Sequence, residues 1–391
     1  MTSGGRQLRV LCTSTGGAGH INALAPVAVA LRGRGHVVQW AVAADGGERV
    51  AAMGFEWSLA GMTTSDRRDA AADQLGRIMQ LPMADRRGPM FAAFFARAAA
   101  PVMQRDLAPI LERVRPDLVV REVAELGVAP MAAARSIPVV TVAFSGVLPE
   151  NARAEVMADL GPLWHVEGFE DPSWDDVHGQ IYVHPFPPSF GQRPDSSAVR
   201  PARATGAPTP GTPPDWVHDL GATRPCVYVT SGTERTAMTF PWRDVFAVIA
   251  GLDVDAVATI GSHVDLVDLG PVPPNVRVER FVPQVDVLQR TAVAISHGGA
   301  GTVLGAASHG VPQLVVPLFA DQWQNAVAVR DAGCGVLAGP DARSAGDIDA
   351  SLRSLLGGAA HRDAAAVVAN EIAAMPTATD LVDEIESLVE R

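Results

Sequence analysis

A glycine-rich turn in the second half of the sequence carries the residues best suited to chemistry. It reads Ser296-His-Gly-Gly-Ala-Gly-Thr302 and follows an apolar run, residues 293–296, that predicts a buried strand. Bare backbone N–H groups at the start of the next helix suit a phosphate group. Asp321 and Gln322 come just after another predicted strand, where a carboxylate and an amide can bind sugar hydroxyls. The segment therefore predicts a diphosphate site beside a sugar site, the two halves of a nucleotide-sugar.

A second glycine-rich turn lies near the N-terminus. A predicted strand, residues 9–13, runs into Ser14-Thr-Gly-Gly-Ala-Gly-His20 and then into a predicted helix, residues 21–32. Gly-Gly-Ala-Gly thus occurs once in each half, each time between a strand and a helix, which hints at two similar α/β units. The first copy ends in His20, whereas the second begins with His297. In isolation, a histidine in the place of His20 is better explained as a helix cap than as a base.

Composition narrows the classes of function. The chain has 391 residues, 48% of them hydrophobic, which is enough for two domains with separate cores. A formal net charge of -12 argues against a nucleic-acid partner or an anionic membrane, since both need a basic face. The basic residues are all arginine, so the sequence excludes a Schiff-base lysine and a P-loop lysine.

The cysteines and the apolar runs bear on the compartment. Cys12, Cys226 and Cys334 are far apart, which favours buried reduced thiols over a disulfide or a metal site. No apolar run approaches the ~20 residues of a membrane-spanning helix, and the first residues lack the apolar core of a signal peptide. We therefore expect a cytoplasmic protein with no membrane partner. The sequence leaves the oligomeric state open, a homodimer included.

Strand-like runs alternate with helical runs in both halves. The predicted strands are residues 8–13, 37–42, 118–120, 139–143, 226–230, 256–260, 276–279, 293–296 and 314–316. This alternation predicts parallel sheets covered by helices on both faces. A segment dense in proline, residues 182–224, is predicted to be an interdomain linker. An amphipathic run, residues 377–390, predicts a terminal helix.

Between residues 61 and 103 the pattern changes to helix rich in methionine, phenylalanine and arginine. The large apolar residues there are Met79, Met83, Met90, Phe91, Phe94, Phe95 and Met103. One interpretation is a core or capping helix. The other is an adaptable apolar wall for a large ligand, because methionine fills irregular space. The residues favour neither interpretation.

Four motifs follow one another in the second half. They read Val229-Thr-Ser-Gly-Thr233, Phe281-Val-Pro-Gln284, His297-Gly-Gly-Ala-Gly-Thr302 with Gly310-Val-Pro-Gln313, and Phe319-Ala-Asp-Gln-Trp-Gln-Asn325. In this order and spacing the chain resembles the nucleotide-sugar glycosyltransferases of the GT-B fold, and more narrowly the bacterial natural-product members of glycosyltransferase family one. Gly19-His20 and Arg115-Pro-Asp-Leu-Val-Val-Arg-Glu122 match more loosely, so that the resemblance covers nearly the whole chain.

The resemblance implies the α/β GT-B architecture, in which two Rossmann-like, doubly wound parallel-sheet domains face a cleft. We place an N-terminal acceptor-binding domain at residues 1–200 and a proline-rich linker at residues 201–224. A C-terminal nucleotide-sugar-binding domain is expected at residues 225–375. A terminal helix, residues 376–391, is expected to pack back on the N-terminal domain.

The resemblance also implies roles for donor-binding residues. Phe281 would lie against the pyrimidine, Val282 would contact the base through its backbone, and Gln284 would reach the ribose. Asp321 and Gln322 would bind the sugar ring. The residues implied to hold the diphosphate are Gly232, Thr233, His297, Gly299, Gly301 and Thr302.

One residue departs from the pattern of many relatives that use uridine donors. Those relatives have a glutamate that grips the ribose hydroxyls where this chain has Gly305. Its loss removes a partner of the 2′-hydroxyl and favours a deoxyribose donor such as a dTDP-sugar. Bacterial relatives often have glycine at this place as well.

By the same resemblance His20 is similar to the family's general base, and its ordinary pKa near neutrality suits proton removal. Glu122 stands where relatives commonly have the aspartate that orients this base, with Ser145 a weaker candidate for contact with His20. The acceptor-binding residues are expected to be Met79, Met83, Phe91, Phe94, Phe95 and Ser145. His297 and the helix dipole would meet the leaving diphosphate without a metal or other cofactor.

These implications predict an inverting, metal-independent glycosyltransferase. Its small-molecule partners would be a nucleotide deoxysugar donor, dTDP-linked, and a bulky apolar natural-product acceptor such as a polyketide or enediyne. Other hypotheses are a catalytically silent auxiliary protein, a GT-B sugar epimerase and a cell-wall glycosyltransferase. Asp253-Val-Asp255 spells the metal-binding motif of another glycosyltransferase class, but it falls between a helix and a strand and is interpreted as a solvated turn.

An NAD(P)-dependent oxidoreductase is a further alternative. Gly17 and Gly19 follow a strand, and Asp45 ends the second predicted strand, as in a dinucleotide-binding fold. Asn22 stands where the third glycine of that fingerprint belongs, and the better phosphate signal lies in the other half of the chain.

Overall fold

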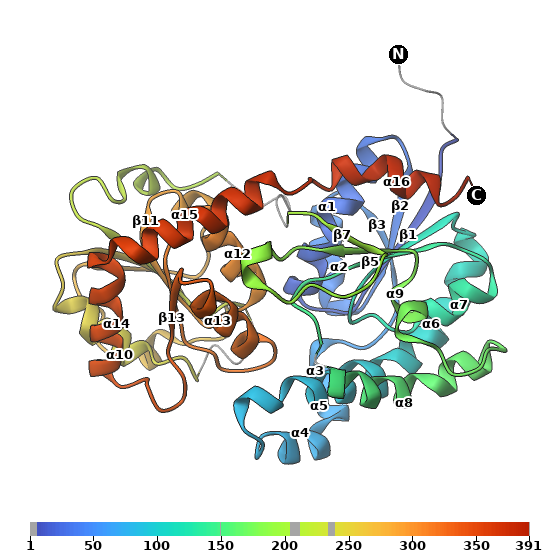
Figure 1. Cartoon of the computed structure of the whole chain (residues 1–391), viewed down its shortest axis with the longest axis horizontal. Coiled ribbons are helices and arrows are strands. Elements are labelled where there is room, and N and C mark those ends of the chain that lie inside the picture. Colours follow the sequence, from blue (N-terminus) through green and yellow to red (C-terminus); the bar gives the residue numbers. More distant parts are fainter. Residues whose placement is uncertain (1–5, 149, 204–211, 234–238, 391) are drawn as a thin grey trace. The chain divides into compact units, whose positions relative to one another are not determined.

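The computed structural model describes residues 6–148, 150–203, 212–233 and 239–390 (Figure 1). The chain divides into two compact units. Unit 1 comprises Met1–Pro185, Gln192–Pro208 and Pro376–Arg391, and unit 2 comprises Phe186–Gly191 and Thr209–Met375. Within the described ranges, none of the helices is both long enough and apolar enough to cross a membrane.

Unit 1 is built on a seven-stranded, wholly parallel sheet with the strand order β3-β2-β1-β4-β5-β6-β7. Its strands are β1 (Arg9–Ser14), β2 (Val37–Val42), β3 (Glu56–Leu59), β4 (Leu118–Glu122), β5 (Val139–Val142), β6 (Ile181–His184) and β7 (Val199–Pro201). Its helices are α1 (Ala18–Gly33), α2 (Ala44–Ala52), α3 (Thr64–Ala70), α4 (Ala72–Ile78), η1 (Met83–Asp85), α5 (Arg87–Phe91), η2 (Ala92–Ala99), α6 (Ala100–Val114), α7 (Val128–Ala134), α8 (Glu150–Val166), α9 (Trp174–His178), η7 (Thr379–Leu381) and α16 (Val382–Ser387).

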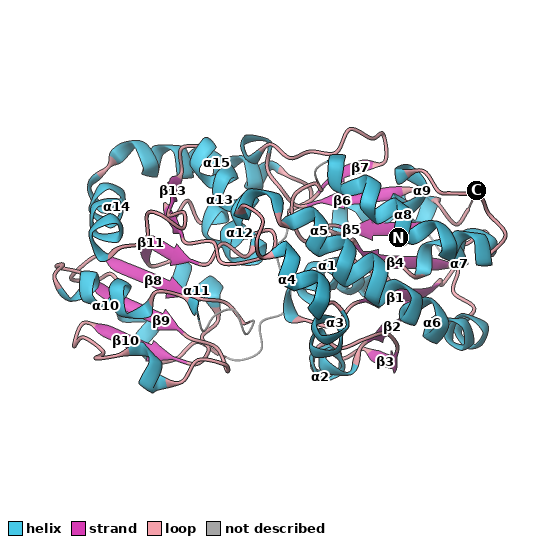
Figure 2. Cartoon of the chain, turned by 90° about the horizontal axis from the view of Figure 1, so that it is seen from below, coloured by secondary structure: helices cyan, strands magenta, loops and turns pink. Residues whose placement is uncertain are grey.

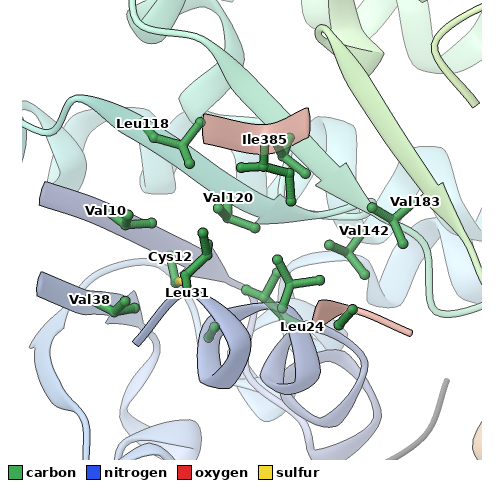
Figure 3. Packing of buried hydrophobic residues seen from close by; sticks show 14 of the residues in the cluster. Val10, Cys12, Leu24, Leu31, Val38, Leu118, Val120, Val142, Val183 and Ile385 are labelled. Carbon is green, nitrogen blue, oxygen red and sulfur yellow. The ribbon is translucent and has the colours of Figure 1, made fainter. Parts of the chain in front are cut away.

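Both faces of this sheet are buried, because successive side chains of each strand point to opposite faces. Figure 3 shows one face, on which strand residues meet Leu24 and Leu31 of α1 and Ile385 of α16. On the other face Leu11 and Val119 pack against α6 and α7. The labelled strand residues of the first face are Val10, Cys12, Val38, Leu118, Val120, Val142 and Val183.

Unit 2 is built on a six-stranded parallel sheet with the order β10-β9-β8-β11-β12-β13, whose strands lie side by side in Figure 2. Its strands are β8 (Cys226–Thr230), β9 (Asp255–Thr259), β10 (Val276–Glu279), β11 (Thr291–Ser296), β12 (Gln313–Val315) and β13 (Gly335–Leu337). Its helices are η3 (Pro188–Phe190), η4 (Asp215–Asp219), α10 (Trp242–Ala250), η6 (Leu266–Leu269), α11 (Gln284–Leu288), α12 (Ala300–Ser308), α13 (Gln322–Asp331), α14 (Ala345–Gly357) and α15 (Ala359–Ala374).

The predicted fold class, two α/β units with parallel sheets, is confirmed. In each sheet the strand order reverses direction between two central strands, β1 and β4 in unit 1 and β8 and β11 in unit 2. Ligands of open α/β sheets bind beyond the carboxyl ends of the strands at such a switch point. Both glycine-rich turns found in the sequence follow one of these central strands, since they come after β1 and β11.

Three expectations about local structure are wrong. The predicted linker, residues 182–224, instead supplies most of β6 and all of β7 to the first sheet, because Ile181–His184 is a fully buried β-forming run. Residues 204–211 of that segment lie outside the described ranges. The helix predicted from 61 to 103 is divided into shorter helices, with Pro82 and Pro89 in the divided region. The terminal helix is shorter than residues 377–390, because α16 is Val382–Ser387.

Candidate functional site

In unit 1 a histidine and a buried carboxylate meet at the switch point. Residues Thr13 of β1 and Arg121 of β4 are partners in the sheet register, so the residues that follow them lie side by side. His20, in the first turn of α1, places Nδ1 3.2 Å from Oε1 of Glu122 and 3.0 Å from Oγ1 of Thr15. The Glu122 side chain has no exposed surface, whereas that of His20 is 16% exposed. The arrangement leaves one edge of the imidazole open to a ligand.

Glu122 is held as a carboxylate. Burial alone would raise the pKa of Glu122, but the charge of a protonated His20 and the hydrogen bonds to the carboxylate outweigh it, so this pKa lies below its ordinary value. The donors are the backbone N–H of Ala124 (2.6 Å) and of Thr15 (3.1 Å) and the hydroxyl of Thr15 (2.8 Å), besides His20. A carboxylate with so many donors is both rigid and ionised.

These partners fix the tautomer of His20. The Thr15 hydroxyl gives its one hydrogen to Glu122, and the carboxylate has none to give. Nδ1 of His20 therefore carries the ring hydrogen, and Nε2 keeps its lone pair. A neutral imidazole in this form can accept a proton at Nε2, and the carboxylate behind it stabilises the imidazolium that results.

Aromatic rings surround His20. The ring centroids of Phe144 and Phe95 lie 4.4 and 5.4 Å from that of His20. Phe95 belongs to η2, a π-helix, and packs against Phe91 and Phe94 with centroid distances of 5.0 and 6.4 Å. A π-helical stretch changes which side chains point to one face and is frequent at functional sites. Of the phenylalanines predicted as an acceptor wall, Phe95 thus contacts the histidine predicted as a base, and Phe91 and Phe94 contact Phe95.

The other residues predicted for the acceptor wall lie elsewhere in unit 1. The Ser145 hydroxyl accepts a hydrogen bond from Nη2 of Arg87 at 2.9 Å, whereas Thr15 and Glu122 are the hydrogen-bonding partners recorded for His20 among the described residues. Met79 ends α4 and is 42% exposed. Met83 begins η1. The structure therefore brings Phe95 against His20, with Phe91 and Phe94 packed on Phe95, and the ring contacts of this cluster do not include the two methionines.

The N-terminal glycine turn is filled by the protein's own residues. A Cβ atom added to Gly16 would lie 1.9 Å from Oδ1 of Asp45, so this carboxylate packs directly on the turn. Asp45 also accepts the backbone N–H of Thr64 at 2.8 Å, and Nη2 of Arg67 donates to the Gly16 carbonyl at 3.1 Å. In a dinucleotide-binding site Asp45 would face a ribose. Here it instead fixes the loop that carries His20.

In unit 2, His297 lies between two glycines at the ends of β8 and β11. A Cβ atom on Gly232 would come within 2.6 Å of the His297 ring, and one on Gly299 within 2.5 Å. Glycine is required at both positions because only a bare backbone leaves room for the ring. Burial lowers the pKa of His297 to about 4. The ring is therefore neutral at physiological pH and can donate one hydrogen bond without carrying a charge.

The turn after β11 opens directly into α12. Gly298 has φ +90, and Gly299 is the N-cap of α12 with no side chain capping the helix. A Cβ atom on Gly301 would meet nothing within 4 Å, so this end of the helix has open space. Nδ1 of His297 and Oγ of Ser231 are buried without a hydrogen-bond partner within the described part of the chain. Free N–H groups at a helix start, beside unpaired polar atoms, suit an anion.

Further residues predicted to bind the donor lie outside this turn. Phe281 is 59% exposed although it is large and apolar, whereas the adjacent Val282 is buried. Gln284 begins α11, and a Cβ atom on Gly305 of α12 would lie 3.4 Å from its Oε1. Position 305 therefore adjoins the glutamine predicted to reach the ribose. Thr233 follows Gly232 (φ +78), and Thr302 lies in the first turn of α12.

The predicted sugar-binding pair begins α13. Asp321 is the N-cap of the helix and follows Ala320, whose φ of +56 is a strained conformation for a residue other than glycine. Oε1 of Gln322 accepts the backbone N–H groups of Leu318 and Phe319, both at 2.8 Å. The amide oxygen of Gln322 is thus committed to shaping the loop, and its NH₂ group is the part left for a ligand.

Known proteins are similar to this chain in sequence and in fold. Residues 243–388 match the family described as the Erythromycin biosynthesis protein CIII-like C-terminal domain. Elloramycin glycosyltransferase ElmGT of Streptomyces olivaceus is 30% identical over 412 residues, covering 97% of each chain. The chain belongs to the bacterial natural-product glycosyltransferases.

Other relatives agree with this membership. TDP-daunosamine transferase DnrS of Streptomyces peucetius is 36% identical over 191 residues, which cover 47% of this glycosyltransferase and 44% of that protein. The crystal structure of the glycosyltransferase SnogD from Streptomyces nogalater matches with a TM-score of 0.76 and 26% identity, covering 98% of this chain and all of that one. The oxidoreductase hypothesis is thereby displaced.

Several residues at the two sites of this glycosyltransferase escaped the sequence analysis. Thr15 lies in the N-terminal motif itself, and Phe144 directly precedes Ser145, which had been singled out. Asn325 closes the last motif and its role appears only from its contacts. In the described part of the chain, no group of three or more His, Cys, Asp or Glu side chains could hold a metal ion.

Proposed function

We propose that this glycosyltransferase moves a deoxysugar from a dTDP-sugar to a hydroxyl group of a bulky, largely apolar natural product, with inversion at the anomeric carbon. The observation that carries the proposal is the orientation of His20. Its Nδ1 meets the buried carboxylate of Glu122, and its Nε2 has no hydrogen-bond partner among the described residues. This is the arrangement that a general base for a hydroxyl nucleophile requires.

The proposed chemistry is a single displacement. The acceptor hydroxyl gives its proton to Nε2 of His20 while its oxygen forms a bond to the anomeric carbon. The bond from that carbon to the diphosphate oxygen breaks, and its electron pair leaves on the diphosphate. The neutral His297 and the start of α12 supply N–H groups to the charge that develops there. Because the residues themselves can accept the proton and stabilise the leaving group, the proposal needs no metal or cofactor.

A thymidine diphosphate donor is supported by two observations. TDP-daunosamine transferase DnrS, which matches 47% of this chain, carries this nucleotide in its name. Gly305 stands next to Gln284, and glycine there provides no carboxylate for a ribose 2′-hydroxyl. The exposed ring of Phe281 is proposed to stack on the base, with Asp321 and the amide NH₂ of Gln322 bound to the sugar.

An apolar acceptor is supported by the rings around His20. The ring centroids of Phe95 and Phe144, both half-buried, lie within 5.4 Å of that of His20, and the buried Phe91 and Phe94 pack on Phe95 and support it. Flat aromatic surface next to a base suits a polycyclic aglycone, whose burial also removes water from the reacting hydroxyl.

The test combines binding with turnover. Thermal shifts with dTDP, UDP, ADP and NADH identify the nucleotide, because a bound ligand stabilises the folded state. Aromatic polyketide aglycones are then incubated with dTDP-sugars, and glycosides are detected by mass spectrometry. We expect His20→Ala to lose turnover and to keep its thermal shift with dTDP. His165→Ala is the matched control, because Nε2 of this exposed histidine of unit 1 also lies beside a carboxylate, 2.9 Å from Oδ1 of Asp171.

Two outcomes would contradict the proposal. Full turnover by His20→Ala would show that His20 is not the general base. A thermal shift with another nucleotide but not with dTDP would show that the donor is not a dTDP-sugar. If no acceptor or donor is turned over although dTDP binds, the chain is the catalytically silent auxiliary protein that remains the second candidate. The dissociation constant for dTDP, measured for both variants, separates these outcomes.

A further inference from the structure

Asn325 of α13 joins the two halves of the proposed donor site. Its side chain is fully buried. Nδ2 donates one hydrogen bond to the carbonyl oxygen of Gly298, at 2.9 Å, and one to Oδ2 of Asp321, at 3.0 Å. Gly298 lies in the turn assigned to the diphosphate, and Asp321 is the carboxylate assigned to the sugar. The NH₂ group of Asn325 therefore donates both of its hydrogens and links the diphosphate turn to the sugar-binding carboxylate.

The orientation of this amide is determined by its partners. A carbonyl oxygen and a carboxylate oxygen can only accept hydrogen bonds, so the NH₂ group has to face them. If the amide were rotated by 180°, its oxygen would face two other acceptors. Oδ1 of Asn325, on the opposite side, is buried and has no hydrogen-bond partner among the residues described. The two donated bonds are thus kept although the acceptor Oδ1 stays buried without a partner. An unpaired buried acceptor destabilises the fold, so its presence calls for an explanation.

The backbone around Asn325 is packed just as closely. A Cβ atom on Gly298 would lie 2.6 Å from Val315 and 3.1 Å from the carbonyl oxygen of Gln322, so the phosphate turn rests on the start of α13. Ala320, immediately before Asp321, has φ +56. The carboxylate of Asp321 is therefore held between a strained residue on one side and the Asn325 amide on the other.

We propose that Asn325 is a positioning residue, which sets the sugar-binding carboxylate of Asp321 in register with the diphosphate turn. The inference rests on the proposed function, because it needs a donor whose diphosphate and sugar are bound by these two groups. The amide occupies Oδ2 of Asp321 and directs Oδ1 toward the ligand. Without the amide, Asp321 can rotate, and the sugar loses a preoriented acceptor while the diphosphate keeps the N–H groups of α12 and His297.

The experiment measures dissociation constants by calorimetry for dTDP and for dTDP-glucose. The quantity of interest is the ratio of the first constant to the second, which isolates the contribution of the sugar. In Asn325→Ala we expect this ratio to fall by about five- to tenfold, as for a lost hydrogen bond to a charged group. The constant for dTDP alone is expected to change less than about threefold. Asn325→Leu, close in size but without donors, serves if the alanine variant does not fold.

Two further variants separate positioning from mere packing. Asp321→Ala should lower the ratio to a similar extent, and adding Asn325→Ala to it should lower the ratio no further, because Asn325 acts through Asp321. Asn275→Ala is the matched control, since Nδ2 of Asn275 also donates two hydrogen bonds to carbonyl oxygens, of Ile249 and Val254. This control should lower the stability of unit 2 and leave the ratio unchanged.

Each outcome bears on a different statement. If Asp321→Ala lowers the ratio but Asn325→Ala and Asn325→Leu do not, the positioning role is wrong and the proposed function stands. If Asp321→Ala leaves the ratio unchanged, Asp321 does not bind the sugar and the positioning role is overturned with it. If the wild-type chain binds neither dTDP nor dTDP-glucose, the proposed donor is wrong and the inference falls with it.

Discussion

Nδ1 of His20 lies 3.2 Å from Oε1 of Glu122, a carboxylate with no exposed surface. The glutamate is longer than the aspartate expected at this position, and the extra methylene group is accommodated because Thr15 and the backbone N–H of Ala124 hold the carboxylate in place. The pair explains how the imidazole of His20 is oriented and how the imidazolium formed by proton transfer would be stabilised.

Replacing Glu122 by glutamine should lower turnover by about 100- to 1000-fold. The amide can present its NH₂ group to His20, which would favour hydrogen on Nε2 and block the lone pair needed for proton removal. The ring tautomer is determined by nitrogen NMR on protein labelled at histidine. The value of kcat is measured with the best acceptor found by screening. Binding of dTDP should be unchanged. An unaltered tautomer together with unaltered kcat would show that Glu122 does not act on His20.

Removing the ring of Phe281 should weaken dTDP binding by about tenfold, the usual size of a stacking contribution to a base. Because the side chain is 59% exposed, Phe281→Ala should leave the denaturation midpoint unchanged. Phe281→Trp should bind dTDP at least as tightly as the wild-type chain, since it offers a larger face. Equal affinities of Phe281→Ala and the wild-type chain for dTDP would show that the pyrimidine does not stack on Phe281.

Introducing a carboxylate at Gly305 should shift the preference from dTDP toward UDP. The new Cβ atom would lie 3.3 Å from Leu288 and 3.4 Å from Gln284, so the neighbours need to give only by a few tenths of an ångström. A hydrogen bond from a ribose hydroxyl to a carboxylate should raise the affinity for UDP relative to dTDP by about tenfold. Gly305→Ala, which adds the same Cβ without the carboxylate, is the control. A preference that is the same in both variants would count against the assignment of this position to the ribose.

Stability should fall as the pH is lowered from 6.5 toward 4. Burial lowers the pKa of His178 to about 3 and those of His184 and His297 to about 4. The unfolded chain binds these protons near pH 6.5 and the folded chain does not, so the unfolded state binds more protons in this range and is favoured by acid.

The loss should amount to about 2 kcal/mol per imidazole at pH 5. Unfolding by urea at pH 7 and pH 5 measures this loss. His178→Asn should show a smaller fall than the wild-type chain, whereas variants of the exposed His263 should match the wild-type chain. Equal falls in His178→Asn and the wild type would mean that His178 is protonated in the folded state.

Local sequence patterns predicted most of the sheet strands, and they failed where tertiary packing decides. β1, β2, β4, β5, β8, β9, β11 and β12 are mostly buried runs rich in apolar residues, and β10 alternates valine with charged residues, so the sequence indicates where each strand begins and ends. β6 and β7 lie in a proline-rich stretch, and their membership of the sheet depends on neighbours far away in the sequence. The exposed edge strand β3 (Glu56–Leu59) and the three-residue β13 carry too few apolar residues to be recognised.

For the site, the sequence identified residues that carry chemistry better than those that support them. His20, Glu122 and His297 stand in motifs, and the structure pairs the first two. The rings around His20 were expected only as a wall, since a π-helix cannot be recognised from a run of alanine and phenylalanine. Thr15 and Asn325 have ordinary side chains, and their importance comes from their partners: the Thr15 hydroxyl links His20 to Glu122, and the Asn325 amide links Gly298 to Asp321.

The return of the chain to unit 1 through α16 constrains how chimeric enzymes can be assembled. Ile385 and Val382 complete the apolar layer over β1 and α1. Arg34 forms ion pairs with Asp383 and Glu386, and His36 forms a hydrogen bond with Glu386. A hybrid that joins the first half of this protein to the second half of a homologue would therefore graft a foreign terminal helix onto the layer shown in Figure 3. Chimeras designed to exchange donor specificity should therefore have two crossover points, one before unit 2 and one after it. The segment Pro376–Arg391 then stays with unit 1, to which it belongs.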